Sequence, residues 1–244
     1  MASARYTLNI TPDEPDEPQK PMTPKQKWEN FWFYHKWHLL VGALVLFLVG
    51  TLVWEVVTNV EADYTIGVLT SKSLPYNAEI TLSEKIAELC DDRNGDGTVE
   101  VQVIEYWISD DPVDANTQMA MVTKFIGDIQ TGESMLFLTD DVDKFQKQYG
   151  IFAYNDGTSP EDYETADTEG MGVLWSECPA LTALDLGNTE ELDGSEGVPL
   201  QDVMKDYTLV KRVYTDSVLE GDEELTAYYN SAVSLFDAWT QKEA

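Results

Sequence analysis

The chain has 244 residues, of which 43% are hydrophobic, and its formal net charge is -30 at pH 7. That hydrophobic fraction suffices for a packed core and excludes a chain that is disordered throughout. The excess of acidic residues, without a stripe of lysines and arginines, argues against nucleic acid as a partner because a polyanion repels phosphate.

The negative charge lies almost entirely after Glu61. From that residue onward the chain has 10 basic and 39 acidic residues, whereas the charges before the apolar segment at Leu39 balance. We interpret the acidic part as the solvated surface of an exported domain rather than as a specific cation site. The N-terminal tail, residues 1–24, is rich in proline and charge and is predicted to be disordered.

An apolar segment follows the tail. Residues 39–54 (LLVGALVLFLVGTLVW) contain no charged side chain, and the apolar character continues past Glu55 to Val57. As a helix, residues 39–57 would rise about 28 Å, close to the hydrocarbon thickness of a bilayer, so they are predicted to form a transmembrane helix. A cleaved signal peptide is the alternative, although its cleavage site at residues 60–62 would be poor.

The segment before the span, residues 25–38, combines aromatic rings with lysines and is predicted to be an interfacial helix. Residues 23–38 (TPKQKWENFWFYHKWH), followed by an apolar span, resemble the start of uncharacterised membrane proteins of anaerobic Gram-positive bacteria. This resemblance implies a bacterial plasma membrane. The predicted interface residues are Trp28, Trp32, Lys36 and Trp37.

Flanking charge predicts the orientation of the span. Lysines precede it closely, whereas the first cation after it is Lys72. Because the positive flank stays inside, we expect a single-pass plasma-membrane protein with a cytoplasmic N-terminus and an extracytoplasmic domain over residues 62–244. The expected partners are the lipid bilayer and an extracytoplasmic protein or small ligand.

The outer domain shows alternating strand and helix patterns, which predict an α/β fold with a parallel or mixed sheet flanked by helices. The predicted strands are residues 64–70, 99–108, 135–139, 172–176 and 207–214. Helices are predicted at residues 81–90, 116–130 and 141–149 and at the C-terminus, and residues 155–170 are predicted to be a surface loop. Apolar residues expected to face inward on the second of these helices are Met119, Val122, Phe125, Ile126 and Ile129.

Residues 118–140 (QMAMVTKFIGDIQTGESMLFLTD) resemble, in outline, a helix, turn and strand of the first lobe of type 2 extracytoplasmic solute-binding proteins. The resemblance implies one such lobe, in which the first strand lies between the second and third. Since the chain after the span has room for one lobe with additions, the resemblance also implies that the two-lobed ligand cleft is missing.

The segment at residues 92–100 (DRNGDGTVE) is similar to a calcium-binding loop. Acidic and amide side chains alternate before Gly97, which permits a sharp turn, but position 12 is Val103 rather than a bidentate glutamate. The alternative is a plain turn between a helix and a strand. Calcium is the one cofactor that the sequence suggests, and its predicted ligands are Asp92, Asn94, Asp96 and Thr98.

Two acidic clusters follow the second and third predicted strands. Because ligands favour the carboxyl ends of strands in an open α/β sheet, the clusters are candidates for a shared site at one edge. The alternative is that they cap helices and complement the helix dipole. The first cluster contains Asp110, Asp111, Asp114 and Asn116, and the second contains Asp140, Asp141 and Asp143.

The outer domain contains no histidine, because His35 and His38 both precede the span. Serine–histidine and cysteine–histidine nucleophile systems are therefore excluded there, and zinc sites lose their commonest ligand. Cys90 and Cys178 are too far apart in sequence for a CxxC motif and form either a disulfide or two buried thiols.

We interpret the chain as a non-enzymatic, membrane-anchored binding or interaction module without a catalytic residue. The alternative is a carboxylate-dependent enzyme that acts on the cell wall or on glycans. A concave pocket with converging acids of perturbed pKa would favour the enzyme, whereas a flat apolar patch would favour an interaction module.

Overall fold

The computed structural model describes residues 21–58, 61–110, 115–190, 196–215, 217 and 219–241. Most of the predicted disordered tail lies outside these ranges. The chain divides into two compact units, Met1–Asn59 and Val60–Ala244, and each is described by itself.

The first unit contains one helix, α1 (Pro24–Thr58), of 35 residues. A single helix thus covers both the predicted interfacial segment and the predicted span. By length and composition α1 can cross a membrane, a property that it shares with signal sequences. Its aromatic side chains are exposed and, at about 100° of rotation per residue, surround the helix instead of forming one stripe. These side chains are Trp28, Phe31, Trp32, Phe33, Tyr34 and Trp37.

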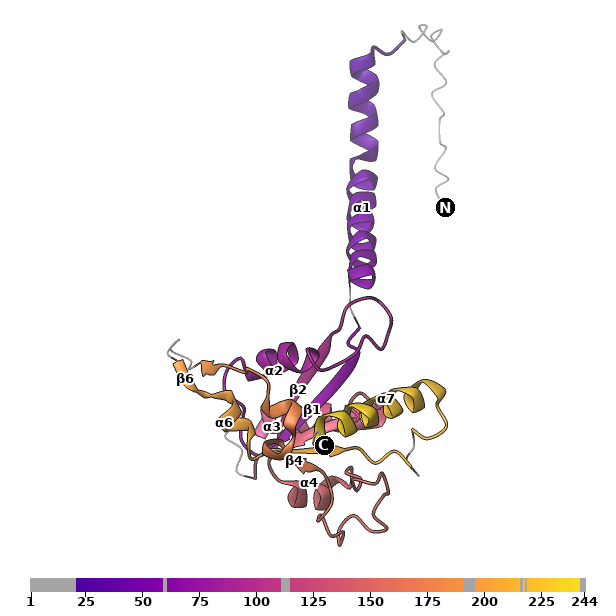
Figure 1. Ribbon diagram of the computed structural model, residues 1–244. Coiled ribbons are helices and arrows are strands. Elements are labelled where there is room, and N and C mark those ends of the chain that lie inside the picture. Colours follow the sequence, from indigo (N-terminus) through magenta and orange to yellow (C-terminus); the bar gives the residue numbers. More distant parts are fainter. Residues whose placement is uncertain are drawn as a thin grey trace, which may run out of the picture. The chain divides into compact units, whose positions relative to one another are not determined.

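The second unit is built on a five-stranded sheet. Its strands are β1 (Tyr64–Thr70), β2 (Val101–Trp107), β3 (Leu136–Thr139), β4 (Val173–Leu174) and β7 (Thr208–Lys211). Their order is β2-β1-β3-β7-β4, so β1 lies between β2 and β3. Figure 1 shows β1 beside β2. β1 pairs in parallel with both neighbours, whereas β7 is antiparallel to β3 and β4. The predicted mixed sheet flanked by helices is confirmed.

One face of the sheet is covered by α2 (Ala78–Ala87), α7 (Glu223–Thr240) and the short helices α5 (Pro179–Thr182) and α6 (Leu200–Met204). The predicted C-terminal helix is confirmed as α7, and Asp222 caps its first turn by accepting two backbone amides. The buried side chains of this face include Ile66, Val68, Leu82, Ile86, Leu138, Leu209, Phe236 and Trp239.

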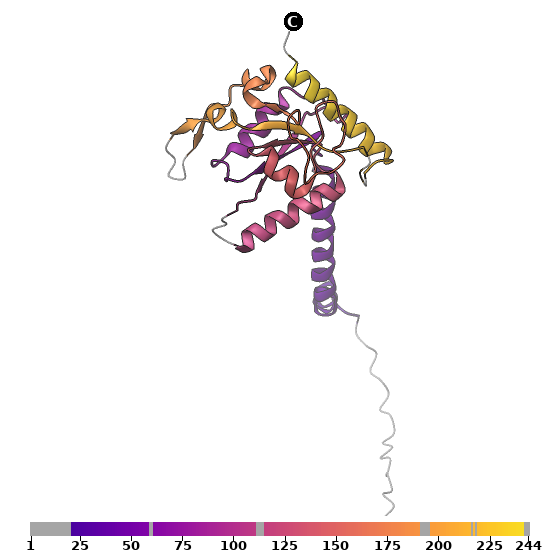
Figure 2. The ribbon, with the colours of Figure 1, turned by 90° about the horizontal axis from the view of Figure 1, so that it is seen from below.

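The opposite face is covered by α3 (Ala115–Thr131) and α4 (Val142–Tyr149) (Figure 2). Its core is aromatic. Gly67 of β1 lies under the Phe137 ring, and a Cβ atom at this glycine would overlap with that ring. The buried aromatic side chains of this face are Tyr106, Phe125, Phe137, Phe145 and Phe152.

Two of the residues predicted to face inward on α3 are exposed. Met119 is 73% exposed and Ile126 is 43% exposed, whereas Phe125 is fully buried. Val122 and Ile129 pack partly against the same core as Phe125. The prediction for Met119 and Ile126 was wrong because α3 contacts the sheet along a narrower stripe than its apolar pattern indicates, and these two residues lie on one flank of that stripe.

Other differences concern element boundaries and short elements. The helix predicted at residues 81–90 lies three residues earlier as α2, directly after Asn77, which has a left-handed φ of 62°. The sequence did not predict α5, α6 or a two-stranded sheet of β5 (Asn188–Glu190) and β6 (Glu196–Pro199). These elements are too short to produce a clear periodicity.

Two consecutive cations at the end of β7 are buried and point to opposite faces of the sheet. The Lys211 ammonium donates to the backbone oxygen of Asn155 at 2.5 Å and lies 4.7 Å from the centre of the Phe236 ring. The Arg212 guanidinium donates to the backbone oxygen of Ser134 at 3.5 Å. Burial lowers the pKa of Lys211 and lowers that of Arg212 to about 10.

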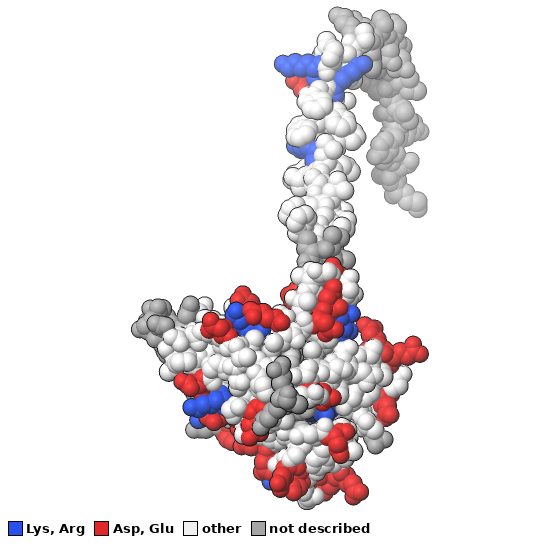
Figure 3. Space-filling view, in the orientation of Figure 1, with Lys and Arg blue, Asp and Glu red and all other residues white. Residues whose placement is uncertain are grey.

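Most acidic side chains remain at the surface. Figure 3 shows them spread over the visible face of the domain with few lysines and arginines among them. The two cysteines are free thiols, with Cys178 buried and Cys90 partly buried. Burial raises the pKa of Cys90 to about 12 and that of Cys178 to about 11, so neither thiol is activated as a nucleophile.

Candidate functional site

The three parallel strands end level with one another at one edge of the sheet. Thr70 of β1 is paired with Trp107 of β2, and the preceding Leu69 is paired with Thr139 of β3. The connections that follow the three strands therefore leave the sheet at the same edge, which is where ligands bind in open α/β sheets. We call it the carboxyl edge.

A hydrogen-bond network fixes the centre of the carboxyl edge. The Thr70 hydroxyl lies 3.2 Å from a carboxylate oxygen of Asp140 and 3.0 Å from the hydroxyl of Tyr207. The Ser71 amide donates to both oxygens of Asp140, at 2.9 and 3.1 Å. Burial raises the pKa of Asp140 and raises that of Tyr207 to about 12. The network ties the start of the β1–α2 connection to the end of β3.

One lysine joins the connections after β1, β2 and β3. The ammonium of Lys144 lies 2.9 Å from Asp110, which is well exposed. It also donates to the Ser71 hydroxyl at 3.1 Å and to the backbone oxygen of Ile108 at 3.4 Å. Asp110 of the first predicted acidic cluster and Asp140 of the second therefore both lie at the carboxyl edge. Asp111 and Asp114 of the first cluster lie outside the described residues, and Asn116 lies in the first turn of α3.

The second acidic cluster divides between two roles. Asp141 caps α4 by accepting the backbone amide of Lys144 at 2.9 Å, and Asp143 pairs with Lys147 at 2.6 Å along the same helix. The capping interpretation is confirmed for Asp141. Asp140 alone of these three acids belongs to the network at the carboxyl edge.

A pocket of about 310 Å³ lies beside this network, between the β1–α2 connection, the start of α2 and β2. Tyr76 and Ile80 present apolar surface and are more than 60% exposed. We call this cavity the α2 pocket. It is lined by residues 73–77, Glu79, Ile80 and Glu105.

Two glutamates of the α2 pocket are fixed by backbone amides. Glu105 accepts the amide of Leu74 at 2.6 Å, and Glu79 accepts the amide of Glu105 at 2.7 Å. Burial raises the pKa of Glu105, and the charge of Glu79 adds to this effect. The pocket therefore combines an apolar rim with two anchored carboxylates, and its connection is held to β2 by the bond between Leu74 and Glu105.

The residues of the α2 pocket do not stand out in the sequence. One signal was present, because Val101, Val103 and Glu105 alternate along β2 and a charged side chain thus follows two buried ones on the same face. Glu79 gave no such signal, since a glutamate in the first turn of a helix is common.

The predicted calcium loop is a series of turns closed by its own side chains. The carboxylate of Asp92 accepts the amides of Gly95 and Gly97, at 2.7 and 2.8 Å. Asn94 accepts the amide of Asp96 at 2.9 Å, and Asp96 accepts the amide of Thr98 at 2.8 Å. This geometry is that of the alternative interpretation, a plain turn, and calcium stays a prediction.

A buried carboxylate that no sequence pattern indicates supports this loop. Asp63 directly precedes β1 and has no exposed surface. Its two oxygens accept the backbone amides of Asn94 and Glu100, both at 2.9 Å. Arg93 donates to the backbone oxygen of Asp63 at 2.6 Å. The loop is therefore attached to the start of the central strand.

The predicted interface residues lie on α1. Trp28, Trp32 and Trp37 are all more than half exposed, and Lys36 lies 5.8 Å from the centre of the Phe33 ring. Among the described residues, no group of three or more histidine, cysteine or acidic side chains is arranged to hold a metal ion. Comparisons with protein-family models, curated proteins and solved structures find no match to this chain.

Proposed function

We propose that the protein is a plasma-membrane-anchored module whose extracytoplasmic domain binds a ligand or partner at the carboxyl edge of its sheet. α1 supports the anchor, because it is long and apolar enough to cross a bilayer. The orientation rests on Lys25, Lys27 and Lys36 before the apolar segment and on the acidic sequence after it. In this arrangement the N-terminus is cytoplasmic.

The α2 pocket carries the binding proposal. Its volume is at the lower end of the range for small-ligand sites, and its rim is apolar. The two glutamates that line it are held by hydrogen bonds from backbone amides, so these side chains lose little conformational entropy when a ligand binds. A fixed concave site at the carboxyl ends of parallel strands is what a binding function requires.

The strand order supports a relation to one lobe of the type 2 solute-binding proteins. That resemblance implies a first strand between the second and the third, and β1 lies between β2 and β3. We infer that residues 61–241 contain a binding domain with this sheet order. The rim of its α2 pocket is exposed to solvent, which favours weak and reversible binding of a small group.

An enzyme is the second candidate, because the α2 pocket is concave and the pKa of Glu105 is raised. In glycoside hydrolysis, however, two carboxyl groups flank the scissile bond. Glu79 instead accepts the backbone amide of Glu105, and Glu105 accepts the amide of Leu74, so both carboxylates are already engaged by the backbone. This geometry suits binding better than an acid and base on opposite sides of a substrate.

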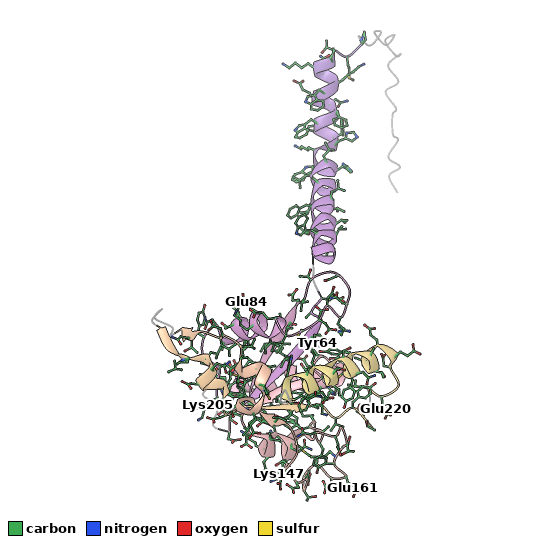
Figure 4. The ribbon with its side chains drawn as sticks, viewed as in Figure 1. Tyr64, Glu84, Lys147, Glu161, Lys205 and Glu220 are labelled. Atoms are coloured by element: carbon green, nitrogen blue, oxygen red, sulfur yellow. The ribbon has the colours of Figure 1, made fainter. Side chains whose placement is uncertain are left out.

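The experiment is proximity labelling in intact cells with a labelling enzyme fused to the C-terminus. The wild-type chain is compared with the double variant Glu79→Gln and Glu105→Gln, and with the matched control Glu84→Gln and Glu161→Gln. Glu84 and Glu161 are exposed and do not line the pocket, and Figure 4 shows them in separate parts of the domain. The proposal expects neighbours that the control retains and the pocket variant loses. Identical neighbours for all three chains would contradict it.

A further inference from the structure

We propose that the α2 pocket recognises an organic cation, namely an alkylammonium group whose charge faces Glu79 and Glu105 and whose carbon chain contacts Tyr76 and Ile80. This inference rests on the proposed binding function and names the chemical class of its ligand. The group comes either from a free small amine or from the lysine side chain of a peptide, and the test below separates these sources.

Charge is the first argument. Two carboxylates line the α2 pocket, and among the ion pairs of the described residues none involves Glu79 or Glu105. Lys144, the cation of the neighbouring network, is bound to Asp110 and Ser71. An incoming cation would therefore find two negative groups whose charge no lysine or arginine of the described chain neutralises by direct pairing.

The apolar rim is the second argument, because it distinguishes an organic cation from a metal ion. Tyr76 is 62% exposed and Ile80 is 64% exposed, and both line the α2 pocket together with Pro75. A hydrated metal ion gains nothing from such surface, whereas an alkyl chain removes it from water. The tyrosine ring also attracts a cation through its face.

The rigidity of the pocket is the third argument. Leu74 is buried, and its amide is bound by Glu105, so the middle of the β1–α2 connection is fixed against β2. The start of that connection is fixed as well, since the hydroxyl of Thr70 donates to the backbone oxygen of Lys72 at 2.7 Å. The carboxylates and the rim thus keep their relative positions before the ligand arrives.

The domain as a whole favours cations. Its charge after Glu61 is strongly negative, and Figure 3 shows acidic side chains across the visible face. Such a field raises the local concentration of cationic ligands and repels anions. Neutral and anionic analogues of the same size therefore provide sharp controls.

The test is isothermal titration calorimetry with the full chain in nanodiscs of zwitterionic lipid, with empty nanodiscs as the blank. The probes are propylammonium, propanol and propionate, together with an acetylated and amidated Ala-Lys-Ala peptide. We expect propylammonium to bind with a Kd in the millimolar range. We expect propanol and propionate to give no saturable heat. Tighter binding of the peptide would identify a lysine side chain as the source, and equal or weaker binding would identify a free amine.

The double variant Glu79→Gln and Glu105→Gln should weaken propylammonium binding about tenfold or more, which corresponds to about 1.4 kcal/mol or more. Glutamine keeps the oxygens that accept the two backbone amides, so the fold is preserved. The control Glu84→Gln with Glu161→Gln removes the same number of charges at exposed sites and should bind as the wild type does. Unchanged binding in the pocket variant, or equal binding of propanol, would overturn the inference.

A second variant keeps the test decisive if the double variant does not fold. Tyr76→Ala changes an exposed side chain and should weaken propylammonium binding several-fold, whereas wild-type affinity in this variant would contradict the role of the rim. If no amine binds while proximity labelling still depends on Glu79 and Glu105, the ligand class is wrong and the binding function stands. If labelling is also independent of both residues, the proposed function falls as well.

Discussion

The carboxylate of Glu79 accepts the backbone amide of Glu105 at 2.7 Å, which joins the first turn of α2 to the edge strand β2. One turn later, the hydroxyl of Ser83 accepts the amide of Val103 at 3.0 Å. β2 ends the sheet, and its outward amides would otherwise be free to pair with a strand of another molecule. Glu79 therefore both protects the edge of the sheet and lines the α2 pocket.

Removal of this protection should promote self-association. The double variant Glu79→Ala and Ser83→Ala leaves two amides of β2 without their side-chain acceptors, and we expect concentration-dependent oligomers of the detergent-solubilised chain in sedimentation velocity. Glu84→Ala, one position along the same helix, is the control. Sedimentation of the double variant that matches this control at every concentration would show that α2 does not protect the edge.

Asp63 should be one of the most sensitive positions of the domain. Asp63→Ala leaves the backbone amides of Asn94 and Glu100 without their acceptor, and we expect a loss of about 2–4 kcal/mol in the free energy of unfolding. Asp63→Asn keeps one carbonyl oxygen and should lose less. Urea unfolding followed by circular dichroism measures both. Equal stability of Asp63→Ala and the wild type would contradict the assigned role.

Gly67 is required because the Phe137 ring occupies the space of a side chain. Gly67→Ala should destabilise the domain by about 1–3 kcal/mol, since the core must shift to accept the extra carbon. Gly127→Ala in α3 is the matched control, because no atom lies within 4 Å of a Cβ there and alanine favours a helix. In thermal unfolding, the melting temperature of Gly127→Ala should equal or exceed that of the wild type. The melting temperature of Gly67→Ala should be clearly lower than that of the wild type.

The raised pKa of Glu105 predicts a pH-dependent stability. Because burial disfavours the ionised carboxylate in the folded chain, the folded state binds this proton more tightly than the unfolded state does. The stability contributed by this proton is therefore present below the unfolded pKa, about 4.3, and is lost as the pH rises through the folded pKa. Glu105→Gln should melt higher than the wild type at neutral pH.

This gain should disappear below about pH 4, where Glu105 is protonated in both states of the wild type. Glu84→Gln, at an exposed position on α2, is the control and should follow the wild-type melting temperature throughout. A gain for Glu105→Gln that persists unchanged at low pH would show that removal of the charge is not its cause.

The loop at residues 92–100 is open to a direct test for calcium. Since Asp92, Asn94 and Asp96 all accept backbone amides of the loop itself, the turn interpretation expects no change in melting temperature when millimolar calcium is added after EDTA treatment. A saturable rise that Asp92→Asn abolishes would establish the calcium loop instead.

The strands and major helices could be predicted because their residues repeat with a clear period. Tyr64, Ile66 and Val68 face one core, and the helix α4 begins directly after Asp141, a residue type that caps helices. The burial of α3 could not be predicted, because Met119 and Ile126 fit the helical period but lie outside the contact that the sheet allows. Sequence pattern gives the apolar side of a helix, not the width of the surface that covers it.

The α2 pocket could not be assembled from the sequence, because it depends on contacts between distant segments. Leu74 and Glu105 are 31 residues apart, and Glu79 and Glu105 are 26 residues apart. The acidic clusters drew attention to the correct edge of the sheet, but Asp141 and Asp143 serve α4 itself. The signal that remained was Glu105, a charged residue in line with buried valines of β2.

Topology in intact cells tests the central claim most directly, since an anchored extracytoplasmic binding domain requires its acidic part to lie outside. Cells that carry the chain with one epitope at each end are treated with an impermeant protease and analysed before and after permeabilisation. The account predicts loss of the C-terminal epitope in intact cells and retention of an N-terminal epitope on a membrane-bound fragment that contains α1. Protection of the C-terminal epitope until permeabilisation, or release of the whole domain into the medium as after signal cleavage, would contradict it.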